Sequence, residues 1–69
     1  MYDENGRLNI NTAGRAELIK LNGIGEKRAN DIIEYREKNG GFTRIEDIMK
    51  VKGIKQGIFS KIKDYIYCP

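Results

Sequence analysis

The hydrophobic residues in the middle of the chain recur with the period of an α-helix. Four residues hold the i, i+3, i+4 and i+7 positions of one helix face: Ala29, Ile32, Ile33 and Arg36. The spacing predicts a helix over about 26–38, in which Glu34 and Lys38 form a favourable i, i+4 pair. Asn39-Gly40-Gly41 is expected to end this helix, because glycine readily takes the left-handed conformation after a last turn.

A shorter helix is predicted before this one, running through about Leu21. Thr12 or Asn11 can cap it by accepting a hydrogen bond from a free helix N–H. Its inward positions are Leu18 and Leu21, supported by Ala13 and Ile19.

Two more helices are predicted after Phe42, which is expected to bring the chain back into the core. Thr43-Arg44-Ile45-Glu46 fits the reciprocal capping box and starts a third helix that ends near Lys50. The inward residues of this third helix are Ile45, Ile48 and Met49. A fourth helix is marked by Ile58, Phe59, Ile62 and Ile66.

The complete pattern predicts an all-α fold of four to five short helices. No segment alternates with period two, so no sheet is expected. Residues 1–7 show no periodicity and are expected to form a flexible lead-in, which leaves 8–67 as the domain. A chain of 69 residues makes one small domain that buries only about 60% of the surface of its unfolded chain.

Two turns rich in glycine repeat each other. Leu21-Asn22-Gly23-Ile24-Gly25 matches Val51-Lys52-Gly53-Ile54-Lys55 when Gly23 is laid on Gly53. Further identical pairs at this offset are Lys20/Lys50, Ile32/Ile62 and Tyr35/Tyr65. So many matches in a short chain indicate an internal duplication and a pseudo-symmetric pair of helical hairpins. The copies differ where Lys55 replaces Gly25: if this position requires a positive φ, lysine is strained there and the second turn differs in shape or binds more weakly.

The start of the helix after the first turn is suited to an anion. The first N–H groups of a helix lack partners within it and lie at the positive end of its dipole. Lys27 and Arg28 stand in this same turn. Phosphate is the anion that such a helix start most often receives.

Charge distribution points to a polyanion more than net charge does. The net charge is only +3, but five lysines and no acid lie between Ile48 and Lys63, across the second turn. A run of charges is often no more than a solvated surface. Next to a duplicated anion-binding turn, it favours a polyanion as the partner.

Composition excludes several other classes of protein. A single cysteine, Cys68, and no histidine exclude a disulfide framework and a zinc site within one chain, and Cys68 is expected to be a frayed terminal thiol. No apolar run is long enough to span a membrane, and no secretory signal is present.

The turns and their flanks resemble a known family. A hydrophobic-Gly-hydrophobic-Gly turn between two helices, followed by basic residues, resembles the helix-hairpin-helix motif, and two in tandem resemble the double helix-hairpin-helix (SAM-like) domain. The DNA-binding domain of the competence protein ComEA family is the more specific resemblance. It is carried by Leu8-Asn9-Ile10-Asn11-Thr12-Ala13, Ala16-Glu17-Leu18, the first turn with Lys27 and Ala29, Ile32-Ile33-Glu34-Tyr35-Arg36, Asn39-Gly40-Gly41-Phe42, Ile45-Glu46-Asp47-Ile48 and Val51-Lys52-Gly53-Ile54.

The resemblance implies binding of double-stranded DNA without sequence preference, in DNA uptake during natural competence. The implied contacts are Gly23, Ile24, Gly25, Glu26, Lys27 and Arg28 in the first hairpin, and Lys52, Gly53, Ile54, Lys55, Gln56, Gly57 and Lys61 in the second. It also implies a monovalent cation on the carbonyls of Ile19, Leu21 and Ile24, and no other metal or cofactor. The implied partners are duplex DNA and other DNA-uptake proteins, with the domain monomeric in isolation, at the cell surface or in the periplasm of a bacterium.

Three alternatives remain open from the sequence. The turns can simply connect helices, the domain can be a protein–protein docking unit, or it can be the DNA-targeting module of a repair nuclease. Catalysis by the domain itself is not expected, because Glu46 and Asp47 diverge by about 100° on a helix. Tyr35 and Tyr65 are interpreted as partial core in preference to base-stacking groups.

Overall fold

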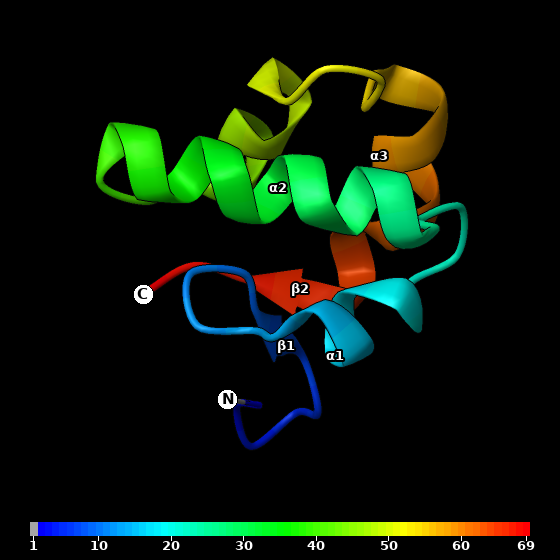
Figure 1. The fold of residues 1–69 in the computed structure, drawn as a ribbon. Coiled ribbons are helices and arrows are strands. Elements are labelled where there is room, and N and C mark those ends of the chain that lie inside the picture. Colours follow the sequence, from blue (N-terminus) through cyan, green and yellow to red (C-terminus); the bar gives the residue numbers. More distant parts are fainter. Residues whose placement is uncertain (1) are drawn as a thin grey trace.

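The computed structural model describes residues 2–69, which fold into a small helical domain with a two-stranded sheet beneath it (Figure 1). The elements, in chain order, are β1 (Leu8–Asn9), α1 (Arg15–Ile19), α2 (Glu26–Asn39), the 3-10 helix η1 (Ile45–Lys50), α3 (Gln56–Ile62), the 3-10 helix η2 (Lys63–Tyr65) and β2 (Ile66–Tyr67). No helix within residues 2–69 is long and apolar enough to cross a membrane.

The long helix α2 follows the predicted bounds closely. It begins at Glu26 and ends at Asn39, and Gly40 follows in the left-handed conformation with φ 75°. The Gly41 N–H closes the end by donating to the Arg36 carbonyl at 2.8 Å. The predicted ion pair between Lys38 and Glu34 is present at 3.7 Å. These details confirm the helix and its glycine stop.

The prediction of no sheet is wrong. β1 pairs in parallel with β2, with Leu8 opposite Ile66 and Asn9 opposite Tyr67. Ile66 therefore lies in a strand and not in the fourth helix, because α3 already ends at Ile62 and η2 separates the two. The strands are two residues long, too short to show alternation in the sequence. Leu8 and Ile66 are almost fully buried, so the pair closes the core from below.

Two predicted helix starts are also wrong in their details. Gly14, and neither Thr12 nor Asn11, precedes α1, and no side chain caps this helix. Asn11 is used elsewhere, since its side chain accepts from the Phe42 N–H at 2.6 Å and donates to the Phe42 carbonyl at 2.9 Å. Ile19, predicted to support the core, is 39% exposed.

At the third helix the capping residues are shifted by one position. Arg44, not Thr43, precedes η1. The Asp47 carboxylate, not that of Glu46, accepts from the Thr43 N–H at 3.1 Å. That hydrogen bond holds the pKa of Asp47 below its usual value.

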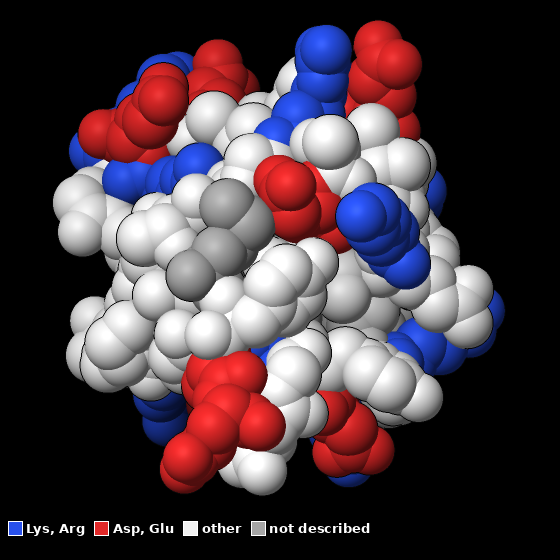
Figure 2. Space-filling model, turned by 90° about the horizontal axis from the view of Figure 1, so that it is seen from below, with Lys and Arg blue, Asp and Glu red and all other residues white. Residues whose placement is uncertain are grey.

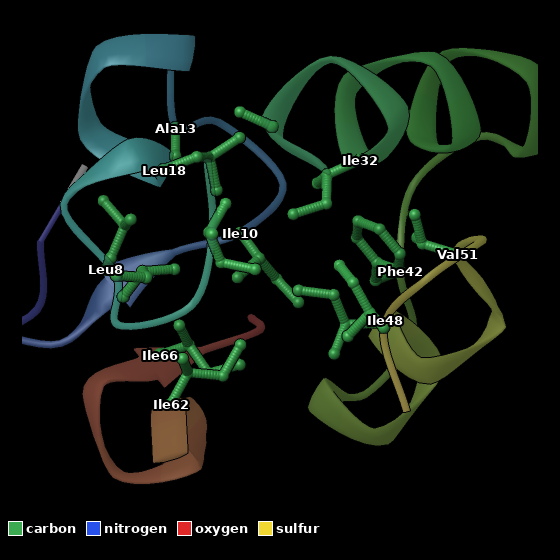
Figure 3. Packing of buried hydrophobic residues seen from close by; sticks show 14 of the residues in the cluster. Leu8, Ile10, Ala13, Leu18, Ile32, Phe42, Ile48, Val51, Ile62 and Ile66 are labelled. Carbon is green, nitrogen blue, oxygen red and sulfur yellow. The ribbon is translucent and has the colours of Figure 1, made fainter. Parts of the chain in front are cut away.

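The core draws on equivalent positions of both halves of the chain (Figure 3). Buried residues pair up at the repeat offset: Leu18 with Ile48, Leu21 with Val51, Ile24 with Ile54, Ala29 with Phe59, and Ile32 with Ile62. Phe42 is buried as predicted, and Tyr35 stacks on it with ring centroids 5.4 Å apart. Tyr65 is 62% exposed, so its assignment to the partial core is wrong.

The two ends of the described chain are both held by hydrogen bonds. Cys68 is not a frayed thiol: its Sγ donates to the Phe42 carbonyl at 2.8 Å, and burial raises the pKa of the thiol. Near the other end, the Asp3 carboxylate accepts from the Arg7 N–H at 2.8 Å and pairs with the Arg7 guanidinium at 2.7 Å. The flexibility of residues 1–7 stays a prediction, and Met1 lies outside the described residues.

Candidate nucleic-acid interface

The two glycine turns have the same backbone geometry. Gly23 has φ 91° and Gly53 has φ 88°, a region that favours glycine because it has no Cβ. The next residue donates its N–H back across each turn, from Ile24 to the Leu21 carbonyl at 3.0 Å and from Ile54 to the Val51 carbonyl at 3.1 Å. Both isoleucine side chains are buried, so each turn is anchored by one apolar residue.

The predicted strain at Lys55 is absent. Gly25 and Lys55 both precede a helix in extended conformation, with φ −93° and φ −119°. Any residue adopts this backbone region, so lysine is accommodated there at no steric cost. Only the first glycine of each turn needs a positive φ.

Free N–H groups follow both turns. The first main-chain bond of α2 runs from the Ala29 N–H to the Gly25 carbonyl at 2.9 Å, and that of α3 from the Phe59 N–H to the Lys55 carbonyl at 2.9 Å. Within residues 2–69, the N–H groups at 26–28 and 56–58 meet no hydrogen-bond acceptor. They remain available to an anion from outside.

The two turns touch each other through matched residues. The Arg28 Nε donates to the Gly53 carbonyl at 3.2 Å. A Cβ on Gly23 would lie 3.6 Å from the Ile58 side chain, and a Cβ on Gly53 would lie 3.5 Å from the Arg28 Nε. Arg28 and Ile58 occupy the same position of the repeat. In each half, the residue at this position lies against the first turn glycine of the other half. The two sets of free N–H groups therefore belong to one continuous surface.

Cations border this surface. Lys27, whose side chain is 82% exposed, makes an ion pair of 3.3 Å with Asp31 that leaves its ammonium group largely in solvent. Lys52, Lys55 and Lys61 are exposed and form no ion pair within the described chain. Lys50, in contrast, pairs with Asp47 at 3.4 Å. The surface thus combines free main-chain donors with unpaired positive charge.

Figure 2 shows the molecule from below, on the side of β1 and the N-terminal segment, where acidic and basic side chains both stand among uncharged residues. No cluster of three or more metal-ligating side chains occurs in residues 2–69.

The residues predicted to contact DNA lie in three different places in the structure. The turn and helix-start residues lie together, whereas Ile24 and Ile54 are buried and support the turns from inside. Lys61 lies farther along α3, beside a surface hollow. The predicted cation on the carbonyls of Ile19, Leu21 and Ile24 stays a prediction.

Sequence reasoning missed the contact between Arg28 and the Gly53 carbonyl. It assigned Arg28 only to DNA, whereas the structure shows that Arg28 joins the two hairpins. The sequence carried no signal for this contact, because the repeat alignment sets Arg28 opposite Ile58, which has no side-chain donor.

Comparison with known proteins agrees with this geometry. A family model described as "Helix-hairpin-helix motif" matches residues 3–67. The chain is 52% identical over 59 residues to "ComE operon protein 1" of Bacillus subtilis, covering 86% of this chain and 29% of that protein. This similarity confirms the resemblance to the ComEA family.

Two other relatives extend the comparison. An uncharacterized protein of Haemophilus influenzae is 46% identical over 61 residues, 87% of this chain and 54% of that protein. "Endonuclease/exonuclease/phosphatase family domain-containing protein 1" of Xenopus laevis is 38% identical over 61 residues, 88% of this chain and 11% of that protein. The chain thus spans between about a tenth and about half of these relatives' lengths.

Proposed function

The chain belongs to the helix-hairpin-helix family, and from this premise we propose that its two hairpins bind double-stranded DNA without sequence preference. The main observation in favour is the pair of adjacent helix starts whose N–H groups have no acceptor in residues 2–69. Contacts from main-chain N–H groups to phosphate fix a protein on the duplex but carry no base information. A surface built from them holds DNA of any sequence.

Two hairpins suit the two strands of a duplex. The reciprocal contacts of Arg28 with Gly53 and of Ile58 with Gly23 support an approximate two-fold relation between the halves. In this arrangement each hairpin takes the phosphates of one strand, from the minor-groove side. The domain acts as a non-catalytic binding module and needs no second copy to do so.

The setting we propose is DNA uptake during natural competence, as part of a larger protein. This rests on the similarity to a relative named for the ComE operon. With this setting we also propose the location and partners that the resemblance implies, namely the cell surface or the periplasm and other uptake proteins. The vertebrate relative, named for a nuclease-type domain, favours a second candidate function, that of a DNA-targeting module attached to a nuclease.

The test is a binding titration with a fluorescent duplex of random sequence at several salt concentrations. Neutralising about four to six phosphates gives a log–log salt slope near −4 to −5. The double variant Lys27→Glu and Lys55→Glu reverses one charge beside each set of free N–H groups and is expected to bind much more weakly.

Lys38→Glu is the matched control. It reverses one charge, where the double variant reverses two, on an exposed residue about 16 Å away along α2 from Lys27, so its loss is compared with that of each single variant. This variant is expected to keep near wild-type affinity. Binding that is indifferent to salt, or equal losses in the double variant and the control, would contradict the proposed surface. Circular dichroism checks that each variant is folded.

A further inference from the structure

A hollow of about 410 Å³ lies beside the first hairpin, outside the two helix starts. Its wall runs from Lys20 and Leu21, at the end of α1, to Lys61 and Tyr65 on the far side, and Tyr2 completes it. Its volume lies within the range of small-molecule sites. Lys61 follows Ile58, the residue against Gly23, by one helical turn, so the hollow continues the proposed DNA surface.

Two aromatic rings stand uncovered at this hollow. Tyr65 is 62% exposed and Tyr2 is 50% exposed, and only Ile19 joins them as an exposed large apolar residue in the described part of the chain. Tyr2 is held in place by a bridge to Leu8, which is itself paired with Ile66 of the strand that follows Tyr65. Tyr65 thus directly precedes the strand that closes the core, and Tyr2 is joined to the same small sheet.

The charges around the hollow suit a nucleotide. Lys20 and Lys61 line it, and both are exposed and make no ion pair in residues 2–69. Glu17 is the one acidic residue in the wall, and its carboxylate is an acceptor for a base N–H group. Lysines attract phosphate, and an aromatic side chain stacks on the face of any base.

We propose that this hollow binds an unpaired nucleotide of the strand that the first hairpin holds, with the base against Tyr65 and Tyr2 and the phosphate near Lys20 and Lys61. The proposal rests on the proposed duplex binding, because the hairpin supplies the strand. It adds a second ligand, the single-stranded end or gap of a DNA molecule, which the duplex surface alone does not distinguish. A docked apolar peptide fits less well, because two lysines and a glutamate interrupt the apolar wall.

The experiment compares three labelled DNAs that share one duplex. The first is blunt, the second carries an overhang of four thymidines, and the third carries four abasic sites in place of the thymidines. The abasic overhang has the same phosphates without bases, so it separates stacking from charge. The wild-type protein is expected to bind the thymidine overhang about fivefold more tightly than the abasic one, the lower end of the effect of a base stacked on an aromatic side chain.

Substitutions at Tyr65 then test whether the preference for the thymidine overhang comes from its ring. Tyr65→Ala is expected to remove the fivefold difference and leave the affinity for the blunt duplex unchanged, whereas Tyr65→Phe keeps the difference because the ring remains. Ile19→Ala, which removes an exposed apolar side chain outside the wall, is the control and is expected to behave as wild type.

The outcomes separate the two proposals. Equal binding of the thymidine and abasic overhangs by the wild type overturns the hollow as a nucleotide site while the duplex surface stands. A Tyr65→Ala variant that loses affinity for all three DNAs alike also overturns it. Failure to bind the blunt duplex in low salt counts against the proposed function itself.

Discussion

Replacing Gly53 by alanine tests the geometry on which both hairpins depend. The residue has φ 88°, and an added Cβ would meet only the Arg28 Nε, at the ordinary contact distance of 3.5 Å. The cost is therefore one of backbone conformation and not of collision. An L-residue in the left-handed region costs about 1–2 kcal/mol, which exceeds the few tenths to 1 kcal/mol gained from a less flexible unfolded chain. We expect a net loss of stability near 1 kcal/mol.

Gly57→Ala is the matched control. Gly57 lies in α3, no atom comes within 4 Å of an added Cβ, and its φ is not positive. Alanine in a helix is better than glycine by about 0.5–1 kcal/mol, so this variant is expected to be more stable than wild type.

Thermal unfolding followed by circular dichroism measures the contrast. For a domain of this size, 1 kcal/mol corresponds to about 4–8 °C in Tm, so the two variants are expected to move in opposite directions by several degrees. Gly53→Ala is also expected to weaken DNA binding, since the relaxed turn no longer presents its N–H groups in the same place. Shifts of equal sign and size in the two variants would refute the assignment of the positive φ to the first glycine of the turn.

Two further predictions concern Asp47 and Lys55. The Thr43 N–H lowers the pKa of Asp47 in the folded protein, so its stabilising effect is present above the unfolded pKa near 4 and is lost as the pH falls through the folded pKa. Urea unfolding between pH 2 and 7 measures this effect. The free energy of unfolding is expected to fall less steeply at acid pH in Asp47→Asn than in the wild type. Lys55→Gly is expected to reduce the salt slope of DNA binding by about 1, and a gain in stability would show instead that lysine is strained there.

The repeat and the long helix could be predicted from the sequence because their signals are local. Gly23 and Gly53 mark turns that need a positive φ, and Gly40 marks a left-handed helix end. Each position is decided by steric limits on one residue and its neighbours. The buried residues of the helices that flank the turns could be predicted in the same way, from helical periodicity.

The sheet could not be predicted because its two strands come from opposite ends of the chain. Leu8 and Ile66 are 58 residues apart in the sequence, and each strand is two residues long. The periodicity of Ile58, Phe59 and Ile62 also runs on without interruption to Ile66. Nothing local distinguishes a fourth helical turn from a 3-10 turn followed by a strand.

The shifted cap of η1 shows a different limit of prediction from the sequence. Glu46 and Asp47 are neighbours, and either carboxylate can reach back to a main-chain N–H at the start of a helix. Which of the two carboxylates does so depends on which residue is the N-cap of the helix. In the structure the N-cap is Arg44. Asp47 is then the third helical residue, the position from which an acid normally reaches back.

The difference between Gly25 and Lys55 suggests how the two hairpins share the work of binding. Both positions are extended, and a Cβ on Gly25 would meet no atom within 4 Å, so a side chain there points into open space beside the free N–H groups. In the first hairpin this space stays empty, and a phosphate can approach the main chain directly. In the second hairpin a lysine occupies it, and in the DNA complex that we propose its exposed ammonium group meets the phosphate at longer range. In this proposal, lysine in place of glycine at position 55 gives up a close main-chain contact with the phosphate and adds a positive charge. The fold of the turn is unchanged, because the residue that needs a positive φ is Gly53, two positions earlier.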